Sequence, residues 1–544
     1  MIADEQVVKG HQSIQQQPTG LLLMAPELLL KILHGLCLKD IVNIAQTCLF
    51  LRSLVISNKA GVMGAYDQYA LDLPLGCPID DLPGALLYEL ACRFNATSLR
   101  LGRAQGPLQS VQEELVDLKF LGLEWRPDHC FRHFFQRGDI FAFRSGTVII
   151  ILKLGRSSVL KRHVKLDLGP DPFHQVDYQL IQEGRSLLIA YASSNFTEHS
   201  ETMDLHVKEV DITEKAFGEM TTHLKIAIPD NQTTLVTIRD PYLVAICSIG
   251  PDGYNNYLVD WRKQTLMLFD ILRPGESQSI EMGMAKPVLD ISEIIFHPEE
   301  AMMIVFYHPS DEDQRCRIHL CRVDIPLGMT SIAQDGLIQP SHLSHHTVES
   351  RGVLTTLPES LSESPFVLSV LSVGLRSLSG LSWVMDVIIH ANPRHTRTPH
   401  VQTDKHDDTA KSYTSRLSID LSNWTSAITA LDNSMLYSYD RVLNHSILPR
   451  CERAIEQIQG TPFFVVERSG QVEVFIPKFE NGEGHEPCWV SLVLPGPNLN
   501  PTPNSESSQT VLDAYLWKSL LCLFNVQTGK LYACFGKYLC VVQL

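Results

Sequence analysis

From about residue 135 to the end of the chain, short runs of apolar and β-branched residues are separated by turn residues. This pattern, with few windows of helical period, is typical of antiparallel strands. The clearest runs cover residues 140–154, 186–192, 204–212, 235–238, 242–248, 257–261, 265–269, 291–296, 301–308, 316–325, 366–373, 383–389, 463–467, 471–476, 488–494, 520–525 and 530–544. The sequence therefore predicts an all-β domain over 135–544, built from many short strands.

A domain of about 410 residues is too long for one β-sandwich, and radially repeated sheets fit its length better. Residues 257–265 predict a strand that ends in Asp260-Trp261, a turn and a second strand, which is similar to a strand-to-strand step of WD-type propeller blades. Residues 521–542 predict three strands with turns at 527–530 and 536–537. We expect a β-propeller-like domain with flexible loops near 392–415 and 495–508. A generic antiparallel hairpin protein is the alternative.

The N-terminal part of the chain has a different, helical period. Residues 1–20 predict a disordered tail, and 21–57 predict three short helices. Pro26 suits the first turn of the first helix, since that turn leaves its N–H groups unpaired, and Gly35 lies near its end. Apolar residues at spacings of three and four form one face of this helix: Leu28, Leu29, Ile32, Leu33 and Leu36. Residues 61–134 predict a helical linker.

The segment 24–54 resembles an F-box, the helical module that docks a protein onto the Skp-type adaptor of a cullin ubiquitin ligase. The matching residues are Glu27, Leu28, Leu29, Ile32, Leu33 and Leu36, then Lys39-Asp40-Ile41, Gln46-Thr47-Cys48 and Leu51-Arg52-Ser53-Leu54. The chain departs from the family at Ala25, where a proline is usual, and lacks the family's late tryptophan, whose place Met63 takes. The order of the parts is similar to that of fungal F-box proteins with a propeller-like C-terminal half.

The resemblance implies an α+β multidomain protein: an F-box over 21–60, a helical linker over 61–134 and a propeller-like domain over 135–544. It implies a substrate receptor that binds a Skp-type adaptor, and through it a cullin, while the β domain holds an unknown target protein. The residues expected to bind the adaptor are Pro26, Glu27, Leu28, Leu29, Ile32, Leu33, Leu36 and Ile41. The alternative is a propeller-type interaction scaffold outside any ubiquitin ligase.

Composition limits the other classes of function. A formal net charge of −16 argues against a broad surface for nucleic acid or anionic membrane. No run of about 18 uncharged apolar residues predicts a membrane span, and the polar N-terminus does not read as a secretory signal. We therefore expect a cytoplasmic or nuclear protein whose 13 cysteines are thiols. The five Asn-X-Ser/Thr sequons then have a low chance of modification.

No residue pattern indicates catalysis or a cofactor. The chain has no G-x-S-x-G, phosphate loop, H-E-x-x-H or C-x-x-C motif. The histidines of the segment 341–346 and those at 395, 400 and 406 read as solvated loops rather than metal ligands, and the basic group 161–165 reads as an exposed strand or turn. The expectation is a protein that is not an enzyme and binds neither metal nor cofactor. A propeller hydrolase would instead need polar groups gathered at a central channel.

Overall fold

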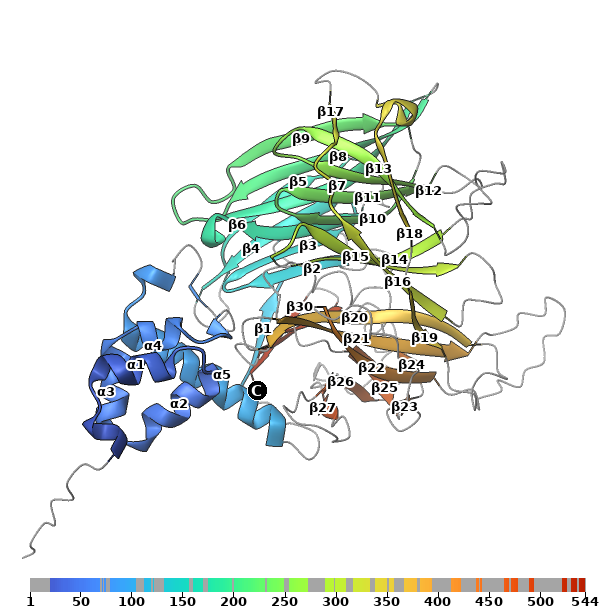
Figure 1. Ribbon diagram of the computed structural model, residues 1–544. Coiled ribbons are helices and arrows are strands. Elements are labelled where there is room, and N and C mark those ends of the chain that lie inside the picture. Colours follow the sequence, from blue (N-terminus) through green and yellow to red (C-terminus); the bar gives the residue numbers. More distant parts are fainter. Residues whose placement is uncertain are drawn as a thin grey trace, which may run out of the picture.

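A computed structural model of the chain shows a small helical module beside a large β domain (Figure 1). It describes the helices and strands named below with most of their short connections. The longest stretches outside the described residues are 1–19, 104–111, 122–131, 273–288, 357–365, 394–411, 422–436, 443–463, 478–488 and 494–520. The predicted tail up to residue 19, residues 394–411 of the first predicted loop and all of the second fall in these stretches. Residues 392–393 and 412–415, predicted as parts of the first loop, belong instead to strands.

Five α-helices make up the helical module, after a short 3-10 turn over Gly20–Leu23. They are α1 (Pro26–Leu33), α2 (Leu38–Thr47), α3 (Leu49–Ser57), α4 (Ala60–Met63) and α5 (Gly84–Arg103). One apolar core holds them together, with Leu33, Ile41, Val55, Val62 and Leu87 among its buried members. Because α5 contributes to this core, the F-box-like segment and the helix that follows it form one packed unit.

The strands of the β domain form seven sheets among the described residues, antiparallel except for one parallel pair, and most are meanders of four consecutive strands. The first three are β2 (Arg132–Arg137), β3 (Ile140–Ser145), β4 (Val148–Leu154) and β5 (Leu160–Asp167); β6 (Val176–Ile181), β7 (Ser186–Thr197), β8 (Ser200–Asp211) and β9 (Met220–Ile228); and β10 (Gln232–Arg239), β11 (Tyr242–Ser248), β12 (Tyr254–Asp260) and β13 (Thr265–Leu272). Two short strands, β17 (Thr330–Ser331) and β18 (His345–Glu349), also pair with β13.

The remaining sheets follow in chain order. They are β14 (Leu289–Phe296), β15 (Met302–Pro309), β16 (Arg317–Asp324) and β19 (Gly352–Thr356); β20 (Phe366–Leu378), β21 (Ser382–Pro393), β22 (Ser412–Asp420) and β23 (Tyr437–Tyr439); β24 (Arg441–Val442), β25 (Phe464–Arg468), β26 (Gln471–Pro477) and β27 (Trp489–Val493); and β28 (Leu521–Asn525), β29 (Lys530–Phe535) and β30 (Tyr538–Gln543), completed by β1 (Gln112–Asp117).

The sheets succeed one another around the domain, as in a β-propeller. The first strands of neighbouring sheets contact each other from β28 through β2, β6, β10 and β14 to β20. Separate apolar cores lie between consecutive sheets, for example between the β2–β5 and β6–β9 sheets and between the latter and the β10–β13 sheet. Radial repetition of sheets in this way leaves only short, protected strand edges. The predicted propeller-like domain is confirmed at this level.

The last sheet is closed by a strand from the other end of the domain. β1 pairs with β30 along its whole length, from Gln112 opposite Gln543 to Asp117 opposite Tyr538. This corrects the predicted boundary: among the described residues, the last α-helix of the linker expected over 61–134 ends at Arg103, and the same segment contains the closing strand. Local periodicity cannot reveal a strand whose partner lies more than 400 residues away. The closure ties the two ends of the β domain together, as it does in closed sheet architectures generally.

Two local predictions in the β domain are confirmed. The Asp260-Trp261 step lies between β12 and β13, and the C-terminal segment forms β28, β29 and β30. The predicted run over 140–154 is a hairpin, since Gly146 turns the chain between β3 and β4 with a φ of +59°.

Candidate docking surface on the helical module

Exposed large apolar side chains concentrate on the helical module. The described part of the chain exposes seven of them, and five lie between residues 23 and 50: Leu23, Leu28, Ile32, Leu49 and Phe50. Single exposed apolar residues are ordinary on a folded protein, but a concentration on a unit of this size is a mark of an interaction surface.

Helix α1 begins where the sequence predicted and presents two apolar side chains outward. Pro26 occupies the first turn, where the carbonyl oxygen of Ala25 accepts the Leu28 and Leu29 N–H groups at 2.9 and 3.2 Å. Leu28 and Ile32 are one helical turn apart and remain 48% and 46% exposed. Pro26 and Glu27 are exposed beside them. About half of each apolar side chain is therefore available to a partner.

The other residues expected at the docking surface lie inside the module. Leu29, Leu33 and Ile41 are only 2%, 3% and 0% exposed, and Leu36 is half-buried against the core that contains Leu33 and Ile41. Their side chains hold α1 and α2 in place, so they have almost no surface left for a partner. The eight predicted residues thus divide into an exposed set and a buried or half-buried set. The reason is that the apolar face of α1 is wider than the area that packs against the rest of the module.

Three exposed residues were missing from the prediction. Leu49, at the start of α3, is 83% exposed, Phe50 is 44% exposed and Leu23 is 70% exposed. The signal for Leu49 and Phe50 was present, since they fall outside the spacing of Leu51 and Leu54, which are buried. A small core of Leu29, Leu51 and Leu54 joins α1 to α3, with Met24 and Cys48 at its half-buried edge. Leu28 and Phe50 are thus each the sequence neighbour of a residue in the core that joins α1 to α3.

A carboxylate from a later loop fixes the start of α2. Asp67 Oδ1 accepts the Leu38 N–H at 2.7 Å, and the Cys37 sulfur accepts the Asp40 N–H at 3.4 Å. Burial raises the pKa of Asp67 to about 6, although the Leu38 N–H bond acts in the opposite direction. Burial also raises the pKa of the Cys37 thiol, and raises the pKa of Tyr66 to about 12. This end of α2 is therefore a desolvated polar site inside the module.

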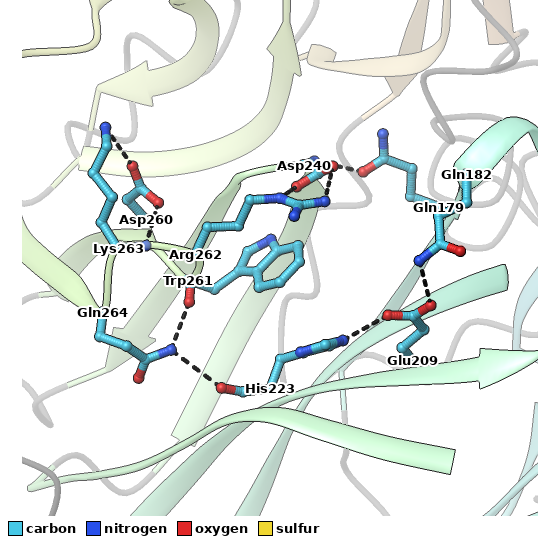
Figure 2. A network of polar contacts seen from close by, with 10 residues as sticks. All are labelled: Gln179, Gln182, Glu209, His223, Asp240, Asp260, Trp261, Arg262, Lys263 and Gln264. Carbon is cyan, nitrogen blue, oxygen red and sulfur yellow. Dashed lines mark hydrogen bonds and ion pairs between the residues drawn. The ribbon is translucent and has the colours of Figure 1, made fainter. Parts of the chain in front are cut away.

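A second candidate functional site is the polar network that lies where the β6–β9 and β10–β13 sheets meet (Figure 2). Trp261, only 3% exposed, has the Arg262 guanidinium 4.7 Å above its ring and the His223 ring 5.0 Å away. Arg262 donates two hydrogen bonds to Asp240, at 2.6 and 2.7 Å. His223 pairs with Glu209 at 2.6 Å. The predicted Asp-Trp step therefore forms the centre of a junction between sheets.

The network is suited to holding the sheets together rather than to chemistry. Lys263 pairs with the buried Asp260 at 3.0 Å, so each cation of the network lies against a carboxylate. Gln264 has a φ of +52°, an uncommon conformation for a residue other than glycine, and its side chain donates to the Trp261 carbonyl at 2.5 Å. Side-chain hydrogen bonds thus stabilise the tight turn that positions Trp261.

The other predicted groups are accounted for where the structure describes them. The basic group 161–165 lies on β5 with its charged side chains exposed, as predicted, and Arg162 donates to the Glu214 carbonyl at 2.6 Å. The segment 341–346, predicted as a solvated loop, instead contains the start of β18, where His345 pairs with Asp270 at 3.0 Å. Among the described residues, no cluster of three or more His, Cys, Asp or Glu is placed to hold a metal ion. Asn95 of the first sequon is 4% exposed, which leaves no room for a glycan.

No helix in the described ranges is long and apolar enough to span a membrane. The predicted histidines at 395, 400 and 406 lie outside those ranges.

Comparison with known proteins places the chain in no family. It matches no family model and no curated protein. Among solved structures, the WD40 domain of SCAP from fission yeast aligns at 9% identity over 76% of this chain and 82% of that one, with a TM-score of 0.35. Drosophila Semaphorin 1b, extracellular domains 1–2, aligns at 8% identity over 80% and 87%, with a TM-score of 0.37. The Malassezia sympodialis allergen Mala s 1 aligns at 11% identity over 70% and 95%, with a TM-score of 0.31. These scores are low, and the assignment of the fold rests on the strand pairing.

Proposed function

We propose that the chain is a substrate-receptor subunit of a cullin-type ubiquitin ligase in the cytoplasm or nucleus. The helical module docks a Skp-type adaptor, and the propeller-like domain holds a target protein. The observation that carries the proposal is the exposure of Leu28 and Ile32 on the helix whose sequence resembles an F-box, together with Leu49 and Phe50 on α3. In this role the protein performs no chemistry, and it acts by keeping a target lysine close to the ubiquitin-charged enzyme.

The packing of the module supports this role physically. A partner helix laid against α1 would cover apolar side chains that water now contacts, and a helix in an apolar groove is a common mode of recognition. Burying the exposed halves of Leu28 and Ile32 would contribute about 1.5–3 kcal/mol together. Leu23, Leu49 and Phe50 add further exposed apolar area on the same helical module.

The test is co-purification of adaptor and cullin with the full chain carrying Leu28→Asp and Ile32→Asp. Both side chains are half-exposed, so the module keeps its core while the docking face gains two charges. We expect adaptor and cullin to be lost. The matched control is Met220→Asp on β9, whose side chain is 45% exposed on the β domain and which should leave co-purification unchanged.

The alternative is a propeller-type interaction scaffold that works outside a ubiquitin ligase. Closed propellers commonly serve as rigid platforms whose loops bind other proteins. If the unmodified chain brings down a reproducible set of proteins without adaptor or cullin, the scaffold role stands and the receptor role falls.

A further inference from the structure

One segment of the chain leaves its own sheet and lies along the edge of its neighbour. The connection between β16 and β19, which pair with each other, runs over residues 325–351. Within it, β17 pairs antiparallel with the start of β13, and β18 pairs with the rest of β13 in the parallel sense, from Leu268 opposite His345 to Leu272 opposite Glu349. We call residues 329–349 the strap; positions 333–337 lie outside the described residues.

The strap occupies the strand edge that β13 would otherwise present to solvent. The Leu268 N–H donates to the Ser344 carbonyl at 3.0 Å, and the Ile332 N–H donates to the Gln264 carbonyl at 2.8 Å. The strap also contacts the preceding β6–β9 sheet, since the Ile338 N–H donates to the Ala227 carbonyl of β9 at 2.9 Å. An exposed strand edge is a template for an added strand, and here the chain supplies that strand itself.

Apolar side chains of the strap enter the spaces on both sides of the β10–β13 sheet. Ile332, Ile338 and Leu343 pack against the core between the β6–β9 and β10–β13 sheets. Met329 and Val348 pack against the core on the opposite face, toward the β14–β16 sheet. The strap therefore straddles the outer edge of β13, and its side chains show what each side of that edge accepts.

The strap is less buried than the strands beneath it. From residue 326 to residue 348, every residue whose exposure is described is half-buried or exposed, whereas Tyr257 and Leu258 in the adjoining β12 are fully buried. Besides the main-chain bonds, the Ser344 N–H donates to Thr330 Oγ1 in a half-buried contact, and His345, 47% exposed, pairs with Asp270. Segments with few buried contacts open locally without unfolding the protein.

We propose that the outer edge of β13, with the apolar spaces on its two faces, is a docking site for an extended peptide segment of a partner protein, occupied in this structure by the strap. The ligand runs parallel to β13. It carries an aliphatic residue at the place of Leu343, a basic residue two positions later whose side chain pairs with Asp270, and an aliphatic residue at the place of Val348. Main-chain bonds to β13 supply affinity, and these three positions supply selectivity. The site belongs to the β domain and does not depend on adaptor docking.

The test replaces the strap with a short Gly/Ser linker and uses a fluorescent synthetic peptide of residues 329–349 as the probe. We expect saturable binding to the strap-deleted protein by fluorescence anisotropy and at least tenfold weaker binding to the full chain. Adding Asp270→Lys to the deletion, or using a peptide with Leu343→Asp and Val348→Asp, should weaken binding at least tenfold. A strap-deleted protein that unfolds cooperatively at an unchanged midpoint but does not bind the peptide would overturn the proposal.

A second measurement uses the intact chain and does not require the deletion to fold. Hydrogen exchange followed by NMR or mass spectrometry compares the Leu268 amide, which bonds to the strap, with the amides of β11 in the middle of the same sheet. We expect Leu268 to exchange at least a hundredfold faster, because the strap opens while the sheet stays closed. Equal protection would show a permanently fixed strap and contradict the proposal. The strap-deleted protein should still co-purify with the adaptor, because the peptide site lies on the β domain. Failure of peptide binding can therefore be distinguished from failure of the proposed adaptor binding.

Discussion

Asp67 makes the stability of the helical module depend on pH in an unusual direction. Burial raises its pKa from the ordinary value of 3.8 to about 6, so the folded module holds this proton more tightly than the unfolded chain does. A group of this kind stabilises the fold fully below pH 3.8, loses that contribution as pH rises to about 6, and adds nothing above. The nearby Cys37 and Tyr66 titrate above this window, since the pKa values of both are raised from already basic values.

The size of the effect follows from the same values. A change from 3.8 to about 6 corresponds to about 3 kcal/mol at 1.36 kcal/mol per decade. Because the side chain is not fully buried and solvent screens part of the interaction, we expect about 1–2 kcal/mol, which is about a 5- to 30-fold change in an opening equilibrium. Asp67→Asn removes the titration and keeps an oxygen that can accept the Leu38 N–H.

Hydrogen exchange of the α2 amides, compared between the full-length protein and Asp67→Asn at each pH, measures this directly, since intrinsic exchange rates cancel. At pH 4 we expect similar rates. At pH 7.5 the unchanged protein should exchange about 5- to 30-fold faster in α2, while amides of β11 exchange alike in both proteins. Two outcomes would refute this reasoning: a ratio of exchange rates between the two proteins that is the same at both pH values, or slower α2 exchange in the unchanged protein at pH 7.5. Either would show that the attraction of the carboxylate to the start of α2 is at least as large as the cost of its desolvation.

Gly84→Ala would place a Cβ 2.3 Å from the Ile56 carbonyl oxygen, so we expect a loss of about 1–3 kcal/mol in urea unfolding followed by helical circular dichroism. Gly61→Ala is its control in the same module, because the new Cβ meets only Leu30 at 3.7 Å and Leu33 at 3.8 Å, and we expect no loss of stability. In the β domain, Trp261→Ala should lower the free energy of unfolding by about 3–5 kcal/mol, measured by circular dichroism because that signal does not rely on tryptophan fluorescence. Arg262→Gln, which changes a side chain that is 52% exposed, should lower it by about 1 kcal/mol or less. Equal losses for the two variants would contradict the dominance of Trp261 packing. Leu28→Ala with Ile32→Ala should weaken adaptor binding by about 10- to 150-fold in calorimetric titration without changing the circular dichroism of the module, and an unchanged affinity would exclude these residues from the interface.

Much of the secondary structure could be predicted because its causes are local. Short apolar runs bounded by turn residues predicted the hairpin of β12 and β13 and the three C-terminal strands, and Pro26 marked the start of α1. The change from helical to strand period separated the module from the β domain. The boundary was misplaced only where a strand, β1, depends on a partner at the opposite end of the domain.

The candidate site was only partly within reach of the sequence. Spacing identifies an apolar face on α1, but it does not say which part of that face the module uses for its own core. Leu28 and Leu29 are neighbours in the sequence and both apolar, yet one is 48% exposed and the other 2%. The difference is set by α3, whose Leu51 and Leu54 pack on Leu29. Leu49 and Phe50 became candidates for the same reason.

By itself, then, the sequence determined the kinds of elements, their order and the resemblance of the N-terminal helices to a docking module, since these follow from the period of apolar residues and from a few turn and capping positions. Tertiary structure decided the features that depend on distant partners: the closure of β1 on β30, the pairing of charges around Trp261, and the strap laid on β13 by the connection of another sheet. Each joins segments far apart in the chain, and a side chain's exposure depends on which of those segments reaches it.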